Sequence, residues 1–124
     1  MATADKIYTA DAGKTSASRQ TFVSGKAAER AGFHAQACSD HVVNLPQLTT
    51  AYPYTADGSR RWSNFTPWPD PWVSIGAMAA VTERLRFFTN VYVLPLRNPF
   101  QVAKTVGTAA TLSGNRVSLG VGMG

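Results

Sequence analysis

Two helix-start signals of the same kind most constrain how this chain can fold. Asp70-Pro71 and Asn98-Pro99 each place a side-chain acceptor at the N-cap and a proline at the first helical position, where its missing N–H costs no hydrogen bond. Each signal opens a helix that an apolar, β-branched run follows, which gives the helix and strand pairs 71–82 with 87–94 and 99–112 with 116–121. Helices that alternate with strands over short connections predict an α/β fold with a parallel sheet.

A third helix and strand precede these two pairs. Apolar residues at three-to-four spacing predict a helix over residues 18–31, and Gly32 ends it because glycine enters the left-handed region without steric cost. A candidate strand at 33–38 follows and leads to Asp40-His41. Residues 87–94 form a nearly unbroken apolar run, which is typical of a strand covered on both faces of a parallel sheet. This pattern alone leaves open whether the sheet is open or part of a barrel.

Length and charge limit the classes of function. The 124 residues suit a single domain. The 12 Lys and Arg residues outnumber the 7 Asp and Glu residues, but they are dispersed, so ordinary solvated cations are favoured over a nucleic-acid surface. No apolar run approaches the length of a membrane helix, and the amino-terminal residues show no secretory pattern. The single cysteine, Cys38, suits a reducing compartment, so we expect a cytoplasmic protein with no nucleic-acid or membrane partner.

Residues 42–69 form a long irregular connection that contains four prolines and five aromatic residues. A disordered insertion is the alternative, but disordered segments are usually poor in aromatic residues. Connections this long inside compact domains are usually lids or binding loops. We therefore expect an ordered loop that faces a small-molecule substrate, with the contact residues Tyr52, Tyr54, Trp62 and Trp68.

Three strand ends carry the residues best suited to chemistry, since parallel α/β folds place their sites at the carboxyl ends of strands. His41 could hold or pass a proton near neutral pH, and Asp40 could fix its tautomer or cap the next turn; a surface histidine without a role is equally open. Asn90 would place an amide in an apolar strand, where it either bonds to backbone in a bulge or faces a ligand. Glycines within 120–124 would allow close approach of a flat or phosphorylated ligand.

Other chemistries find little support in the residues. A dinucleotide fingerprint needs a helix directly after its glycines, and the sequence does not show one. His34, His41 and Cys38 lack the spacing of a metal site, so no metal is expected. Cys38 lies within a predicted strand and is expected to pack in the core rather than to act as a nucleophile.

Several motifs in fixed order resemble the bacterial luciferase-like monooxygenase superfamily of flavin- or coenzyme F420-dependent oxidoreductases. The matching segments are 28–33, 39–43, 52–58, 70–73, 79–86, 93–99, 112–116 and 119–124. The resemblance implies the amino-terminal half of a TIM (β/α)8 barrel, with about four parallel strands alternating with helices. Residues 26–124 would then be a partial barrel domain cut after its fourth strand, and residues 1–25 a poorly patterned segment with a candidate first strand.

The resemblance also implies roles for the residues at the strand ends. By that match His41 is the catalytic or orienting group, and Asp40 supports it. The family's third strand carries a bulge with a non-prolyl cis peptide behind the cofactor ring, which falls on Asn90-Val91 here. The residues that match the segment near the edge of the ring are Gly122, Met123 and Gly124.

The expected activity is hydride transfer between reduced coenzyme F420 and a small organic substrate, because residues 53–58 look most like the branch that uses this cofactor. One alternative is an FMN-dependent monooxygenase that uses dioxygen. Another is a non-catalytic half-barrel that self-associates or forms a homo-oligomer, since an open parallel sheet exposes unpaired edges and an apolar face.

Overall fold

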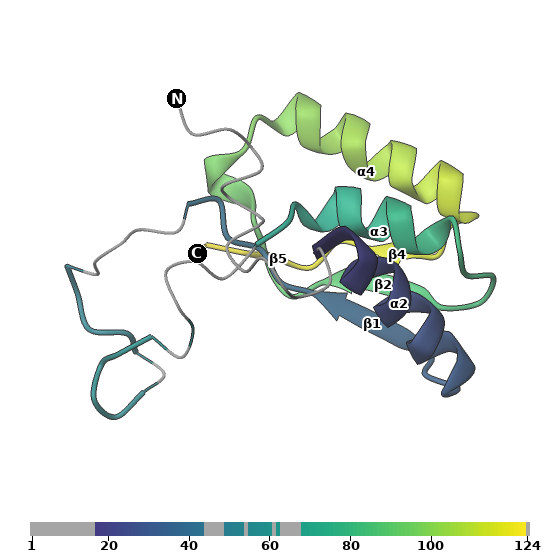
Figure 1. Ribbon diagram of the computed structural model, residues 1–124. Coiled ribbons are helices and arrows are strands. Elements are labelled where there is room, and N and C mark those ends of the chain that lie inside the picture. The colour runs from purple at the N-terminus through teal and green to yellow at the C-terminus, as the bar shows by residue number, and fades with distance from the viewer. Residues whose placement is uncertain (1–16, 44–48, 54, 61, 63–67, 124) are drawn as a thin grey trace.

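The computed structural model describes residues 17–43, 49–53, 55–60, 62 and 68–123, and for residues 17–23 only the backbone is described. Helices and strands alternate along the chain (Figure 1). The elements are α2 (Ala17–Arg30), β1 (Ala35–Cys38), α3 (Pro71–Ala79), β2 (Arg86–Thr89), β3 (Tyr92–Val93), the 3-10 turn η1 (Leu94–Leu96), α4 (Pro99–Ser113), β4 (Val117–Ser118) and β5 (Val121–Gly122). This order confirms the predicted α/β class. The candidate first strand at 6–10 lies outside the described residues.

Both predicted helix starts are confirmed by their hydrogen bonds. The Asp70 carboxylate accepts from the N–H groups of Trp72 and Val73, and the Asn98 side chain caps α4 in the same way. The helix α3 ends at Ala79, three residues before the predicted end. It stops early because the Arg116 guanidinium donates to the carbonyl oxygens of Ala79 and Thr82 at 2.9 and 3.0 Å, which satisfies acceptors that another turn would have used.

The strands are parallel and neighbour one another in chain order. The first sheet has the order β1-β2-β4, and β3 pairs with β5 as a second, shorter ladder. The continuous strand predicted over 87–94 is therefore wrong, since the chain breaks between β2 and β3. At the break, the Thr89 hydroxyl donates to the Gly120 carbonyl oxygen at 2.8 Å and accepts from the Gly120 N–H at 3.0 Å, which replaces regular ladder bonds between the two strands.

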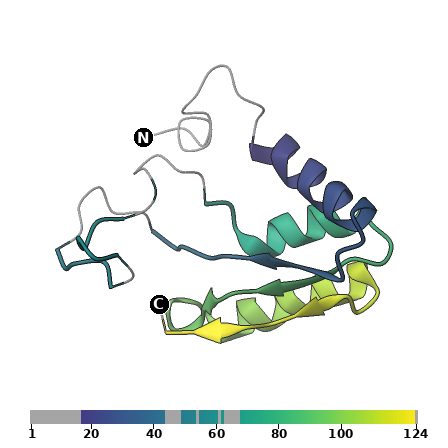
Figure 2. The ribbon, with the colours of Figure 1, turned by 90° about the horizontal axis from the view of Figure 1, so that it is seen from below.

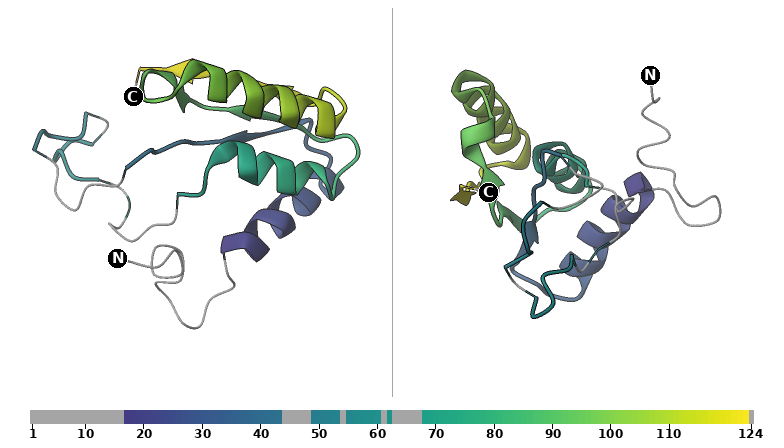
Figure 3. Two further views of the ribbon diagram at one scale, coloured as in Figure 1. Left: turned by 90° about the horizontal axis from the view of Figure 1, so that it is seen from above. Right: turned by 90° about the vertical axis from the view of Figure 1, so that its left-hand side faces the viewer.

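All three helices pack on one face of the sheet (Figures 2 and 3). Phe87 points toward them and is 1% exposed, whereas the next residue, Phe88, lies on the other face and is 37% exposed. The prediction that this strand is covered on both faces is therefore wrong for the described part of the chain. The buried core between the helices and the sheet comprises Trp72, Ile75, Met78, Ala79, Leu85, Phe87, Tyr92, Val102 and Ala109.

Candidate functional site

The carboxyl ends of the strands meet at one edge of the sheet, on the left in Figure 1. The Asn90 N–H donates to the Cys38 carbonyl oxygen at 2.8 Å, and the Tyr92 N–H donates to the Gly120 carbonyl oxygen at 2.8 Å. The first bond joins the end of β1 to the residues between β2 and β3, and the second joins β3 to the residues between β4 and β5. They bring the residue pairs 40–41 and 90–91 and the segment 120–123 to one place, as the order of the strands predicts.

Asp40 is a buried carboxylate at this edge, and its side chain is 2% exposed. It accepts from the Val93 N–H at 3.0 Å, and both of its oxygens accept from Nη2 of Arg97, at 2.7 and 2.8 Å. His41 is not among these partners, so within the described residues Asp40 neither holds the imidazole nor caps a turn. It fixes the strand end from which His41 projects.

Arg97 is the residue of this site that sequence reasoning missed. It follows η1, and its guanidinium lies 4.5 Å from the centre of the Tyr92 ring. Burial, the largest single influence, disfavours its charge, but Asp40, Tyr92 and Asp70 together outweigh burial and raise the pKa of Arg97 above its ordinary value. In the sequence, the available signal is its place directly before the Asn98 N-cap and three residues after the end of the predicted strand 87–94.

His41 packs against the long connection through aromatic contacts. Its ring centre lies 4.4 Å from that of Trp68 in an edge-on arrangement and 5.2 Å from that of Trp62. Trp62 in turn contacts Trp68 and Tyr52, with ring centres 5.5 and 5.2 Å apart. The structure therefore brings together His41 and three of the four predicted substrate-loop residues. Tyr54, the fourth, lies outside the described residues.

The segment that carries Tyr52 closes on itself in a tight turn. The Tyr52 N–H donates to the Gly58 carbonyl oxygen at 2.8 Å, and Gly58 adopts a φ of +71°, which favours glycine. Asp57 accepts from the Ser59 N–H and hydroxyl at 3.1 and 2.8 Å. The described part of the loop around Tyr52 is thus held by its own hydrogen bonds.

The peptide bond between Asn90 and Val91 is cis, as the resemblance implied. Val91 is 40% exposed, and its side chain occupies the space that a Cβ on Gly122 would need. Gly122 therefore allows β5 to pack closely on Val91. Met123 is 84% exposed at the same edge, and Gly124 lies outside the described residues. The cofactor-binding roles of these residues stay predictions.

Cys38 and possible metal ligands add no chemistry to the site. Burial raises the pKa of the Cys38 thiol to about 11, so the side chain stays protonated and packs against the core as expected. The part of the chain that the structure describes holds no cluster of three or more His, Cys, Asp or Glu side chains placed to bind a metal ion.

Among the same residues, no helix has both the length and the apolar character to span a membrane.

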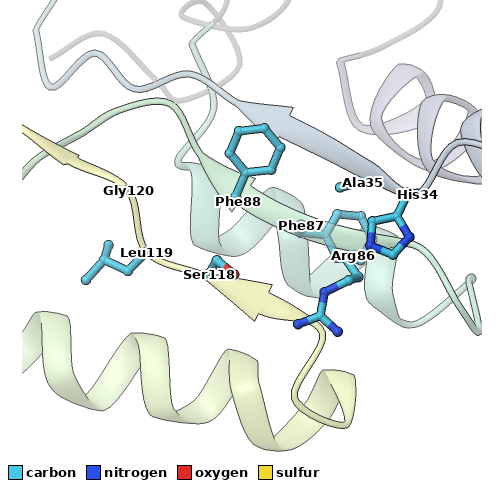
Figure 4. Close-up of a pocket in the computed structure, with 8 residues that line it drawn as sticks. All are labelled: His34, Ala35, Arg86, Phe87, Phe88, Ser118, Leu119 and Gly120. Atoms are coloured by element: carbon cyan, nitrogen blue, oxygen red, sulfur yellow. The ribbon is translucent and has the colours of Figure 1, made fainter.

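A separate hollow of about 300 Å³ lies on the face of the sheet that the helices leave uncovered (Figure 4). His34 and Arg86 line it near the beginnings of β1 and β2, and Phe88 and Leu119 line it farther along. Gly120 borders the hollow, so it extends toward the carboxyl edge, but Asp40, His41, Val91 and Met123 do not line it.

Three comparisons with known proteins place the chain among its relatives. A family model described as luciferase-like monooxygenase matches residues 8–124. An uncharacterized protein of Mycobacterium tuberculosis is 44% identical over 97 residues, which cover 78% of this chain and 34% of that protein. A second uncharacterized protein of the same organism is 36% identical over 118 residues, which cover 95% of this chain and 40% of that protein.

Solved structures share the fold at low sequence identity. The oxygenating constituent of 3,6-diketocamphane monooxygenase from Pseudomonas putida, solved in complex with FMN, superimposes with a TM-score of 0.65 at 20% identity over 90% of this chain and 26% of its own. A monooxygenase from Streptomyces bottropensis gives a TM-score of 0.63 at 20% identity, over 93% of this chain and 30% of its own. The likeness confirms the predicted fold as part of such a barrel. The chain spans 34% and 40% of the length of these two curated relatives.

Proposed function

The chain belongs to the luciferase-like monooxygenase family, and on that premise we propose that the whole protein is an oxidoreductase that binds a flavin-type ring at the carboxyl edge of the sheet. The observation that carries this function is the meeting of His41, its tryptophan neighbours and Val91 at that edge. Sites in barrels of parallel strands lie at this end.

The residues at the edge suit a flat, largely apolar ring. Val91 and Val121 are 40% and 52% exposed, and Met123 is 84% exposed, so apolar surface is available at the ends of the third and fourth parallel segments. Gly122 has no Cβ and therefore leaves room for the Val91 side chain, which lets the two segments approach closely. A planar ring that covered these side chains would remove apolar surface from water.

A flavin-type ring, when bound, supplies a position that accepts or releases hydride. The residues of this chain then have three tasks. His41 holds or donates a proton at its imidazole, where its ring is packed against Trp68 at 4.4 Å. Trp62 contacts the exposed His41 ring and Tyr52 contacts Trp62, so these two side chains would border a substrate bound beside His41. Asp40 and Arg97 hold the backbone that precedes His41.

Coenzyme F420 is the first candidate for the cofactor, with hydride transfer to or from a small organic substrate. Its support is the likeness of residues 53–58 to the branch that uses it, together with the closed turn that brings Tyr52 onto Trp62. FMN with dioxygen, in a monooxygenase reaction, is the second candidate. It is favoured by the solved relative of the same fold that was crystallised with FMN.

A parallel titration of the chain with reduced or oxidised F420 and with FMN tests both candidates. We expect the visible absorbance of F420 to change on binding, and His41→Gln to alter that change while His34→Gln, a histidine near the other end of β1, leaves it as in the unaltered chain. Tight binding of FMN with no response to F420 would replace the first candidate by the second. Failure of both cofactors to bind would overturn the proposed function.

A further inference from the structure

We propose that Arg97 is a positioning residue that clamps the two ends of the connection 42–69 and thereby holds His41 against Trp68. One guanidinium contacts Asp40, two residues before this connection, and Asp70, the residue directly after it. A role for this clamp in catalysis rests on the function proposed above, but the clamp itself is a property of the structure and can be tested without a cofactor.

The first end of the connection is fixed through Asp40. Its carboxylate is almost completely buried, so it requires a charged partner, and Nη2 of Arg97 lies 2.7 Å from Oδ1 and 2.8 Å from Oδ2. The Val93 N–H donates to the same carboxylate at 3.0 Å. Asp40 is therefore held to β3 and to Arg97 at once, and His41 is the next residue in the chain.

The second end is fixed through Asp70. Its Oδ1 caps α3, while its Oδ2 faces Nη1 of Arg97 at 3.4 Å. One oxygen therefore caps the helix, and the other is available to contact Arg97. Trp68 lies two residues before Asp70, so the clamp acts close to this ring as well.

The guanidinium is itself held in a defined orientation. Nη1 donates to the Tyr92 hydroxyl at 3.1 Å, and Cζ of Arg97 lies over the Tyr92 ring, 4.5 Å from its centre. Tyr92 is 4% exposed and packs in the core, which anchors Arg97 to the rigid part of the fold. A guanidinium can make these contacts together, whereas a lysine ammonium has no second nitrogen to reach the other partner.

The consequence concerns the contact between His41 and Trp68. These rings belong to opposite ends of a long connection, yet their centres lie 4.4 Å apart. Each ring sits within two residues of a carboxylate that Arg97 contacts. The distance between the two carboxylates, which Arg97 sets, therefore controls whether the two rings meet.

Two variants test the clamp without removing a helix cap or leaving a buried carboxylate unpaired. Arg97→Lys keeps a positive charge for Asp40 and loses the link to Asp70. Asp70→Asn keeps the oxygen that caps α3 and loses the charge that faces Arg97. Ile75→Val is the control, because it weakens the core, where Ile75 is fully buried, without touching either carboxylate.

Trypsin cleavage gives the first readout, because Arg60 and Arg61 are the only lysine or arginine residues between residues 31 and 83. We expect both test variants to be cut there about threefold to tenfold faster than the unaltered chain. The second readout is the part of the near-ultraviolet circular dichroism spectrum that Trp68→Phe removes, and both test variants should reduce it.

The clamp is supported if the two test variants change both readouts and Ile75→Val changes neither, even with a larger drop in melting temperature. It is overturned if cleavage follows melting temperature across all three variants, or if Asp70→Asn behaves as the unaltered chain. If neither F420 nor FMN binds in the titration above, while trypsin cleavage and circular dichroism change as expected, the proposed function is refuted and the clamp is still supported.

Discussion

Single charged side chains join segments that lie far apart in the sequence. The Glu29 carboxylate accepts from the backbone N–H groups of three consecutive residues, Glu83, Arg84 and Leu85, at 2.6 to 3.1 Å. Arg116 donates to the ends of two helices and to the Leu85 carbonyl oxygen. Hydrogen bonds from these side chains to backbone groups thus connect the amino-terminal edge of the sheet to the helices.

The pH dependence of stability tests the Glu29 contact. Hydrogen bonds from the N–H groups of Arg84 and Leu85, with that of Glu83, lower the pKa of Glu29 below its ordinary value of 4.5. A carboxylate whose pKa is lowered by folding contributes stability above that ordinary value, and the contribution is lost as pH falls through the lowered one. We expect Glu29→Gln to lower the unfolding free energy in urea at about pH 7 and to differ little from the unaltered chain at about pH 3.

Glu83→Gln is the matched control for this measurement, because the Glu83 side chain is exposed and makes no hydrogen bond among those of the described residues. A Glu29→Gln deficit that is the same at both pH values would show that the charge of Glu29 contributes nothing to the contact.

Gly120 makes a second residue-scale test. A Cβ at this position would overlap the Thr89 carbonyl oxygen, which is backbone and cannot move aside freely. We expect Gly120→Ala to destabilise the chain by about 2 kcal/mol. Gly107 lies within α4, and a Cβ there would point into open space, so we expect Gly107→Ala to stabilise the chain by about 0.5–1 kcal/mol. Urea unfolding of both variants measures the difference. Equal effects would contradict the close contact between Gly120 and Thr89.

The sequence identified part of the site because that part is local. Asp40 and His41 end a strand, and their place at the carboxyl edge follows from the order of the elements. Their partners were not predictable in the same way. Arg97 meets Asp40 only after two strands pair in register, and the Trp68 ring reaches His41 across the whole connection. Contacts of this kind depend on tertiary distance, which a spacing along one chain does not contain.

At the scale of elements, the ends of the helices are the features that the sequence specifies most clearly. Asx-Pro signals start α3 and α4, and Gly114, with a φ of +65°, ends α4 in the left-handed conformation. These signals are read from neighbouring residues, so the helices were predicted within three residues of their ends. The strand breaks were not, because the Thr89 side chain at the end of β2 bonds to the backbone groups of Gly120, which lies between β4 and β5.

The cap of α4 gives a prediction at this scale. The Asn98 side chain accepts from the N–H groups of Phe100 and Gln101 at 3.0 and 3.2 Å. We expect Asn98→Ala to lower the unfolding free energy by about 1 kcal/mol, because these N–H groups lose their partner. Asn98→Asp keeps the acceptor and places a negative charge at the helix start, so it should be as stable as the unaltered chain. A destabilised Asn98→Asp variant would contradict the capping role.

At the scale of the whole molecule, the helices leave one face of the sheet uncovered. The helices cover one side of the sheet (Figure 3), and the other side exposes Phe88 and Leu119 at 37% and 40% (Figure 4). In a complete (β/α) barrel this side is filled by layers of inward-pointing side chains. The alternation of helices and strands predicted the fold class but not which face is covered, since that depends on strands beyond the pairs described.

Self-association of the 124-residue chain is a prediction that concerns this open face. We propose that two copies meet through it, because among the described residues no element covers its apolar side chains and none pairs with the outer edge of β1. Light scattering coupled to size exclusion should show a dimer or larger species, and Phe88→Glu should yield monomer. Phe100→Glu, on the outer side of α4 and 84% exposed, should leave the assembly unchanged. A monomeric unaltered chain at micromolar concentration would refute this assembly.

The binding of a flavin-type ring at the carboxyl edge is tested most directly by mapping it with backbone amide resonances. Assigned spectra of the chain, recorded with and without F420 and then FMN, report which residues sense the ligand. We predict the largest shifts at His41, Val91 and Met123, with little change at His34 and Arg86 around the hollow on the open face. Shifts that centre on His34 and Arg86, or no shifts with either ligand, would contradict a cofactor site at this edge.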